Sequence, residues 1–408
     1  MGSKSFYLRK DCRLCHSRDL ELVVPMTPTA LCDAYTRKRK NQEVYPLDLY
    51  LCNRCGFAQI GCVIEPEVIY RDYLYVTTSS LELTNHFKQY AEDVTSRLHL
   101  LKKISVLDIG SNDGTLLKYF KNKEMNVLGI EPANEIAAQA NIAGVDTIPE
   151  FFGLDVSELL KVEYGLFDVV TVNNLFANID DLDDFVRSLL NVLAPNGVII
   201  IESAYLPDMI DNLMFDFIYH EHLSCFSIFP LERFLAKYDL RLVDLQHVTT
   251  KGGSMRYYFA SSLSDHKVEE TVERFKTIEE GLELSTKKPY EKFNQRINAC
   301  KNHLRSLMQR NRHKKIAGYG ASATTTTLLY HFGIHEYLDF LVDDFSQKIG
   351  TYSPGYNLKV LESEEIHQKS IDIVLVIAWR YAEQIMNKHN HFKGTFIVPL
   401  PEIKVYTQ

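Results

Sequence analysis

The residues best suited to chemistry lie near the middle of the chain, in the run Tyr219-His-Glu-His222 among bulky apolar neighbours. A phenol, a carboxylate and two imidazoles occupy four consecutive positions there. Such a cluster suits removal of a proton from carbon next to a carbonyl, with imidazole as base and a phenol or second imidazole stabilising the enolate. Two other interpretations fit the same residues: a metal site, because His-x-His pairs chelate, and a structural hydrogen-bond network.

Two cysteine pairs form a second group with defined chemistry. Of eight cysteines, four make C-x-x-C knuckles, Cys12 with Cys15 and Cys52 with Cys55. This spacing is typical of a tetrahedral zinc site. Four thiolates leave no open coordination position, so the expected zinc ion is structural.

A glycine turn predicts a cofactor site. The apolar run 106–109 is followed by Gly110, and Gly114 precedes apolar residues at helical spacing. A strand, a glycine turn and a helix in this order form a nucleotide-type binding corner. Asp108 at the strand end, and the absence of a third closely spaced glycine, favour S-adenosylmethionine (SAM) over a dinucleotide.

The next strand supports the same interpretation. It is predicted over 126–131 and ends in Glu131, whose carboxylate can accept both ribose hydroxyls where parallel strands end. A weak strand over 146–148 is followed by Phe152, a candidate flank for the adenine ring.

A mostly parallel sheet is needed to position these residues. Strong strand patterns cover 167–174 and 197–202, and 241–248 with 254–260 could form a closing antiparallel pair. Strands alternating with helices predict an α/β fold with helices on both faces of the sheet, as in Rossmann-like SAM-dependent methyltransferases.

The length of 408 residues allows two or three domains. We expect a small zinc-binding domain at 1–75, a SAM domain at 76–262 and a Rossmann-like domain at 263–408 that begins with one or two long helices. A second strand, glycine turn and helix start occupies 315–322. Its amides could hold a phosphate, or the turn could close the domain without a ligand.

Composition argues against several classes of partner. The net charge of −8 argues against nucleic acid. No stretch approaches ~20 uninterrupted apolar residues, so no membrane span is expected. Residues 1–5 lack the apolar core of a secretory signal, and we therefore expect a cytoplasmic enzyme. The oligomeric state stays open.

The run Tyr70 to Ser80 is dense in tyrosines and hydroxyls. Tyrosines can line a sugar site by stacking and hydrogen bonding, and Tyr75 is the candidate here. A linker held by aromatic packing is the alternative.

Across nearly the whole chain these motifs resemble the SAM-dependent sugar C-methyltransferases, which act on nucleotide-linked 4-keto-6-deoxyhexoses. The matching features are the two knuckles, the tyrosine-rich run, and residues 108–114, 129–133, 173–177, 219–222, 251–256, 317–322 and 342–343.

The resemblance implies that the C-3 proton, acidified by the C-4 ketone, is removed and that the enolate attacks the SAM methyl group. His222 matches the base, with Tyr219 and Glu221 as supporting residues. The expected cofactor-binding residues are Asp108, Gly110, Asn112, Glu131, Phe152, Asn173 and Asn174. A nucleotide-diphosphate sugar would lie between the domains, and its expected contacts are Tyr75, Ser254, Arg256, Tyr319 and Ser322.

Two positions depart from the family pattern. Asn178 stands where the family usually carries histidine, near the expected active site, and Thr324 stands where it usually carries lysine. Asparagine can donate a hydrogen bond but cannot relay a proton. Two other functions therefore stay open: an O- or N-methyltransferase acting on a sugar nucleotide, and a non-catalytic protein that binds one.

Overall fold

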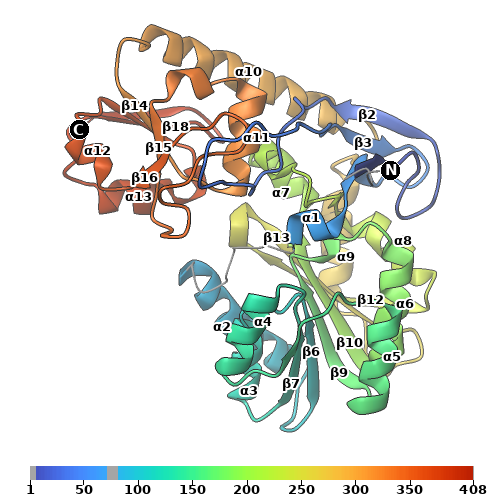
Figure 1. The fold of residues 1–408 in the computed structure, drawn as a ribbon. Coiled ribbons are helices and arrows are strands. Elements are labelled where there is room, and N and C mark those ends of the chain that lie inside the picture. The colour runs from blue at the N-terminus through green and yellow to red at the C-terminus, as the bar shows by residue number, and fades with distance from the viewer. Residues whose placement is uncertain (1–5, 71–80, 408) are drawn as a thin grey trace, which may run out of the picture.

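The computed structural model describes residues 6–70 and 81–407 and contains three parts (Figure 1). The central sheet lies at the bottom of the view, mainly in green, the C-terminal part at upper left in orange and red, and the N-terminal part in blue. This is the α/β architecture that the sequence predicts. Within the described ranges, no helix has the length and apolarity needed to cross a membrane.

The central sheet has seven strands in the order β12-β13-β10-β9-β6-β7-β8. The parallel strands are β6 (Ser105–Ile109), β7 (Asn126–Ile130), β8 (Thr147–Ile148), β9 (Phe167–Asn173) and β10 (Leu193–Ala204). The expected closing pair is also present, as β12 (Leu240–Val248) and β13 (Ser254–Ser261) run antiparallel to each other. β13 is in turn antiparallel to β10.

Helices cover both faces of this sheet (Figure 1). One face carries α2 (Leu81–Arg97) and α3 (Thr115–Lys121), and the other carries α5 (Leu154–Glu163), α6 (Leu182–Val192) and α8 (Ile228–Ala236). The sheet region also includes α4 (Asn134–Ile142) and α9 (Glu270–Glu280), which packs against β12. With both faces covered, β9 and β10 are near-continuous apolar runs, as buried parallel strands require.

The N-terminal part is built on short antiparallel strands. They are β1 (Phe6–Leu8), β2 (Leu20–Val24), β3 (Leu49–Cys52), β4 (Ala58–Ile60) and β5 (Cys62–Ile64), followed by α1 (Pro66–Tyr70). The four-stranded sheet has the order β11-β4-β3-β2. Its edge strand β11 (Ser224–Cys225) comes from far along the chain and begins two residues after His222.

The C-terminal part has a six-stranded sheet in the order β16-β15-β14-β17-β18-β19. Its strands are β14 (Ile316–Tyr319), β15 (Phe340–Asp343), β16 (Val360–Glu362), β17 (Ile373–Val376), β18 (Thr395–Val398) and the antiparallel β19 (Lys404–Thr407). Its helices are α10 (Lys288–Arg310), α11 (Ala323–Phe332), α12 (Glu365–Gln368) and α13 (Ala382–Lys388). The long helix expected ahead of this sheet is α10.

The segment after β10 leaves the central sheet. It begins with α7 (Leu206–Asp211), and its apolar residues through Leu223 share one core with the N-terminal sheet and the C-terminal domain. Tyr219 to His222 therefore lie where all three parts meet. We keep the predicted domain boundaries at 75 and 262 as predictions, although this segment packs outside the central sheet.

Candidate functional site

A first cavity, of about 400 Å³, opens at the ends of β6, β7 and β9. Every predicted cofactor residue lines it: Asp108, Gly110, Asn112, Glu131, Phe152, Asn173 and Asn174. The β6–α3 turn forms its floor, with Gly110 at φ 73°. A Cβ on Gly110 would lie 3.0 Å from the Leu175 side chain, so a larger residue would crowd the turn.

Two carboxylates face this cavity from neighbouring strands. Asp108 Oδ1 accepts hydrogen bonds from Thr171 Oγ1 at 2.6 Å and Asn173 Nδ2 at 3.4 Å. Burial raises the pKa of Asp108 to about 7. The second carboxylate, Glu131, is held by the backbone N–H groups of Asn112 at 3.0 Å and Ala133 at 2.9 Å. Burial also raises the pKa of Glu131.

The lining of the first cavity fits SAM. The buried Asn173 Oδ1 has no hydrogen-bond partner among the described residues and can accept from an ammonium group. Phe152, packed edge-on against Phe185 with ring centroids 5.5 Å apart, offers an apolar wall for adenine. The two carboxylates can hold cationic and hydroxyl groups. These residues would hold the amino-acid, ribose and adenine parts of SAM.

His222 lies at the inner end of the first cavity. Its Nδ1 is 2.9 Å from the Phe217 carbonyl, and its Nε2 is 3.0 Å from the Tyr219 hydroxyl. A carbonyl can only accept, so Nδ1 carries the proton and the lone pair of Nε2 accepts from the Tyr219 hydroxyl. Burial lowers the pKa of His222 to about 4, and the charges of Lys251 and Arg380 add to this effect. The ring is therefore a neutral proton acceptor at pH 7.

The rest of the Tyr219–His222 run surrounds this acceptor. Glu221 is buried, and its charge acts on both Tyr219 and Lys251. Burial raises the pKa of Tyr219 well above its usual value, so its phenol stays protonated. His220 points elsewhere, with Nε2 3.2 Å from the Pro46 carbonyl in the N-terminal part.

A second cavity, of about 240 Å³, lies on the other side of His222. Both cavities share Asn174, Tyr219, Glu221, His222 and Lys251 as lining residues. The remaining wall brings together the N-terminal and C-terminal parts through Asp33, Ser322, Thr324, Lys348, Arg380 and Tyr381. A molecule in either cavity can thus reach the same imidazole.

The predicted substrate residues are spread over different places. Ser322 lines the second cavity, at the start of α11. Tyr319 lines neither cavity, and its hydroxyl donates to Asp344 at 2.9 Å. Ser254 is buried and donates to the Thr250 carbonyl at 3.2 Å. Tyr75 lies outside the described residues. The substrate roles of all these residues stay predictions.

Arg256 is engaged inside the central sheet. Its Nε donates to Glu202 at 2.8 Å and its Nη1 to Gln246 at 2.9 Å, and the side chain is fully buried. The guanidinium also lies over the Tyr90 ring, 3.7 Å from its centroid. The residue lines neither the first nor the second cavity. Its contacts hold strands β10 and β13 together.

Asn178 and Thr324, the two departures from the family pattern, each line a cavity. Asn178 lines the first, with its buried Oδ1 lacking a hydrogen-bond partner among the described residues. Thr324 lines the second, with Oγ1 3.0 Å from Ser322 Oγ.

Sequence reasoning missed the cations of the second cavity, which are Lys251, Lys348 and Arg380. Lys251 belongs to the recognised run 251–256, but the prediction names Ser254 and Arg256 from it. The available signal was a lysine directly before two glycines, Gly252 and Gly253, in a hairpin loop.

The four knuckle cysteines come together as predicted. Cys12 and Cys55 have sulfur atoms 3.5 Å apart, as do Cys15 and Cys52, and all four lie within 4.8 Å of one another. A tetrahedron with Zn–S bonds of about 2.3 Å has S–S edges of about 3.8 Å, so the four sulfurs fit a zinc ion. The ion would join the two knuckles of the N-terminal part.

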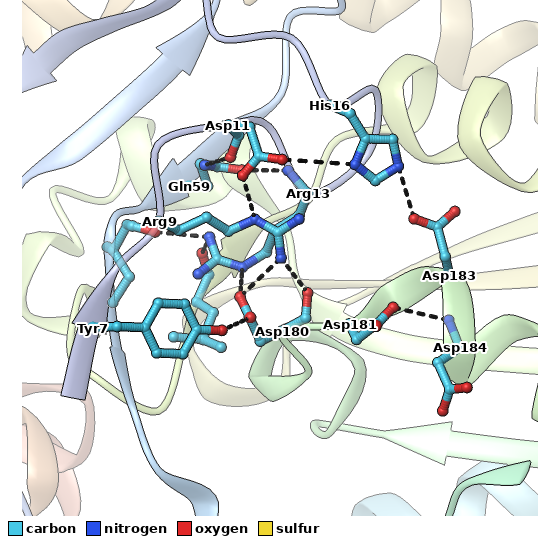
Figure 2. Close-up of polar contacts among 12 residues, drawn as sticks. Tyr7, Arg9, Asp11, Arg13, His16, Gln59, Asp180, Asp181, Asp183 and Asp184 are labelled. Carbon is cyan, nitrogen blue, oxygen red and sulfur yellow. Dashed lines mark hydrogen bonds and ion pairs between the residues drawn. The ribbon is translucent and has the colours of Figure 1, made fainter. Parts of the chain in front are cut away.

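Figure 2 shows how the first knuckle contacts the active-site region. Arg13, between Cys12 and Cys15, is fully buried and donates from Nε to Asp180 Oδ1 at 2.8 Å. Its Nη1 donates to the Ile60 carbonyl at 2.7 Å and the Leu223 carbonyl at 3.3 Å. Arg9 and Tyr7 also bond to Asp180, which lines the first cavity. The zinc-binding part thereby holds both the Asn178–Asp180 loop and the residue after His222.

A parallel sheet with this glycine-turn cavity beside a buried proton acceptor defines a SAM-dependent methyltransferase. Three family models match in succession: a zinc binding domain at 12–70, a methyltransferase domain at 83–245 and a C-methyltransferase C-terminal domain at 249–401. The C-methyltransferase NovU of Streptomyces niveus is 30% identical over 404 residues, or 97% of this chain and 96% of that protein. The chain belongs to this C-methyltransferase family.

More distant likenesses cover the central domain. A ubiquinone biosynthesis O-methyltransferase of Rickettsia felis is 26% identical over 117 residues, or 28% of this chain and 46% of that protein. The plantazolicin methyltransferase BpumL, solved with a triazolic desmethylPZN analog and SAH, is 13% identical with a TM-score of 0.37. That match covers 45% of this chain and 87% of BpumL, and at this score it carries no functional argument.

Proposed function

We propose that the protein transfers the methyl group of SAM to C-3 of a nucleotide-linked 4-keto-6-deoxy sugar through an enolate. The observation that carries this proposal is the position of His222 on the wall shared by two cavities. Its Nδ1–H is held by the Phe217 carbonyl, and its Nε2 can accept a proton. Methyl transfer to the carbon next to a ketone requires a base that first removes a proton from that carbon. Transfer to an amine or a hydroxyl involves no proton removal from carbon.

In this mechanism His222 Nε2 removes the C-3 proton of a sugar bound in the second cavity. The C–H electron pair becomes the C-3–C-4 double bond, and negative charge moves to the C-4 oxygen. When bound in the first cavity, SAM would supply an electrophilic methyl group to C-3 and would leave as S-adenosylhomocysteine while the ketone reforms. The protein's share of that second step is alignment, since the two cavities meet at Asn174 and the Tyr219–His222 run.

The second cavity is also the proposed place of the nucleotide diphosphate. Lys348, Arg380 and the amide end of α11 at Ser322 line it, and all three suit anionic groups. Thr324 stands on the same wall. A lysine there would add a charge next to the phosphates, so its absence bears on which nucleotide sugar binds.

Product analysis tests the proposal. The zinc-loaded protein is incubated with SAM and thymidine diphosphate-4-keto-6-deoxyglucose, and the product is examined by mass spectrometry and NMR. A gain of one CH₂ unit with a new carbon–carbon bond at C-3 supports the proposal. A methyl group at C-5 would correct the position, and a methyl group on oxygen or nitrogen would overturn the carbon-acid mechanism. Absence of turnover across a panel of keto sugar nucleotides would favour the non-catalytic alternative.

A further inference from the structure

Lys251 stands in the loop between β12 and β13 and lines both cavities at their junction with His222. Its backbone is left-handed, with φ 56° and ψ 23°. Gly252 and Gly253 follow at φ 92° and φ 128°. A Cβ on Gly253 would approach Asp208 Cγ to 2.4 Å, so the loop requires glycine there. The backbone conformation of this loop is thus tightly constrained, and it places a lysine at the junction.

The other cations of the second cavity each have a carboxylate partner. Lys348 Nζ lies 2.6 Å from Asp33 Oδ1 and 2.7 Å from the Ala321 carbonyl. Arg380 Nη2 lies 2.7 Å from Asp216 Oδ1. Lys251 differs, because its ammonium has no hydrogen bond and no ion pair within 4 Å among the described residues. Lys251 is half-buried, so its ammonium has lost part of its hydration without gaining a partner and suits an anionic ligand.

The surroundings of Lys251 act on the pKa of its ammonium group in opposite directions. Burial lowers the pKa of Lys251, while the carboxylates of Glu202 and Glu221 act in the opposite direction. The charge of Lys251 in turn contributes to the lowered pKa of His222. A new negative charge at this junction would relieve both effects.

We propose that the Lys251 ammonium binds the C-4 oxygen of the keto sugar and stabilises the negative charge that develops there when His222 removes the neighbouring proton. This inference rests on the proposed function. The broken C–H bond gives its proton to Nε2 and its electron pair to the new double bond, and Nζ compensates the charge on oxygen. When C-3 takes the methyl group, the pair of the C-3–C-4 double bond forms the new C–C bond and the oxygen charge reforms the ketone. The pair of the broken S–CH₃ bond stays on sulfur as neutral S-adenosylhomocysteine, and the proton on His222 leaves to solvent.

The weakness of the base explains why such a group is needed. The pKa of the His222 imidazole, near 4, is far below the pKa of a base suited to proton removal at neutral pH. The missing driving force has to come from stabilising the enolate. A preorganised donor at an oxyanion typically contributes about 10²–10³-fold in rate, and a charged donor in a buried site belongs at the upper end. Tyr219 carries no charge, and its one hydroxyl proton is directed at His222 Nε2.

Lys251→Met in the full-length, zinc-loaded enzyme tests this role, with Lys251→Arg as the conservative variant. The control is Lys276→Met. Lys276 Nζ lies 3.0 Å from Glu232 Oε2, and Lys276 lines neither cavity. Deuterium incorporation beside the ketone of thymidine diphosphate-4-keto-6-deoxyglucose is followed by NMR in D₂O with S-adenosylhomocysteine present. Methylation kinetics give kcat and KM separately.

We expect Lys251→Met to slow both exchange and kcat by about 10²–10³-fold, with KM and SAM affinity changed by less than about threefold. Lys251→Arg should recover part of the rate, and Lys276→Met should match the wild type. Because a half-buried cation without an ion pair is removed, the Tm of Lys251→Met should stay level or rise. A purely structural lysine would instead lower it.

Three results would overturn the inference. The first is an exchange rate in Lys251→Met equal to that of the wild type. The second is a rise in KM with kcat unchanged, which would assign the lysine to the phosphates. The third is a fall in Tm large enough to account for the lost activity. If the wild-type enzyme itself gives neither exchange nor methylation with the probe, the proposed function fails as well. Activity in the wild type with no effect of Lys251→Met refutes this inference alone.

Discussion

Arg13→Met should uncouple the zinc-binding part from the active site. The guanidinium of Arg13 joins three segments: Asp180 in the loop after Asn178, Ile60 on β4, and Leu223 directly after His222. Methionine keeps most of the apolar stem but has no donor. The variant therefore removes the polar contacts between the first knuckle and the Tyr219–His222 run while leaving the cysteines in place.

The size of the effect follows from burial. Breaking a buried ion pair costs about 3–5 kcal/mol. Asp180 keeps its bond to Arg9 at 3.1 Å, and its side chain is 20% exposed, so the lower end applies. A loss of about 3 kcal/mol corresponds to a fall in Tm of about 6–12 °C for a domain of this size. A looser His222 should also reduce kcat by up to about 10²-fold, because reacting atoms tolerate little displacement.

The matched control is Arg9→Met. Arg9 also bonds to Asp180, through the backbone carbonyl at 2.9 Å and Oδ1 at 3.1 Å, but no contact joins it to Leu223 among the described residues. We expect a loss of about 1 kcal/mol and wild-type exchange rates. Calorimetry gives Tm, metal analysis gives zinc content, and deuterium exchange reports on the base. Equal exchange rates in Arg13→Met and Arg9→Met would refute a positioning role for Arg13.

Four further predictions concern pH, zinc and SAM. Since burial lowers the pKa of His222 to about 4, kcat/KM should stay level down to about pH 5 and fall as pH drops through about 4. A fall of kcat/KM that is already centred near pH 6.5 would show that the base is solvated. Because the pKa of His222 is lower in the folded chain, the unfolded chain binds the proton at a higher pH. The free energy of unfolding should therefore fall as pH drops from 6.5 towards 4. Urea unfolding at each pH measures this change. Cys55→Ser should lower zinc content and Tm and slow exchange about tenfold, because β4 pairs with β11 next to His222; full exchange in zinc-free protein would contradict this. Glu131→Gln should raise the Kd for SAM about 10- to 100-fold in calorimetry with little change in zinc content, and an unchanged Kd would remove Glu131 from the ribose site.

Much of the fold could be predicted because its signals are local. The β-branched run of β9, the glycine turn after β6 and the two cysteine knuckles each follow from neighbours in sequence. The predicted strand over 197–202 lies inside the longer β10, which already pairs with β9 at Leu193 and resumes after a register shift at Val198. These elements needed no information about the rest of the chain.

The less predictable features depend on contacts between distant segments. The pairing of β11 with β4 joins the strand after His222 to the zinc-binding part, and neither short strand announces this partner. Arginine is a residue type that often binds anionic ligands. Arg256, however, lies directly opposite Glu202 in the β10–β13 register and pairs with it. Lys251 gains its importance from the meeting of two cavities, which only the packed structure brings together.

The most direct test of the central claim is deuterium exchange at C-3 of thymidine diphosphate-4-keto-6-deoxyglucose with S-adenosylhomocysteine present, comparing the wild type with His222→Asn. Asparagine keeps a polar side chain but cannot accept the proton as a base. We predict exchange at C-3 by the wild type and none above the solvent background by His222→Asn, with unchanged zinc content. Full exchange by the variant would contradict His222 as the base.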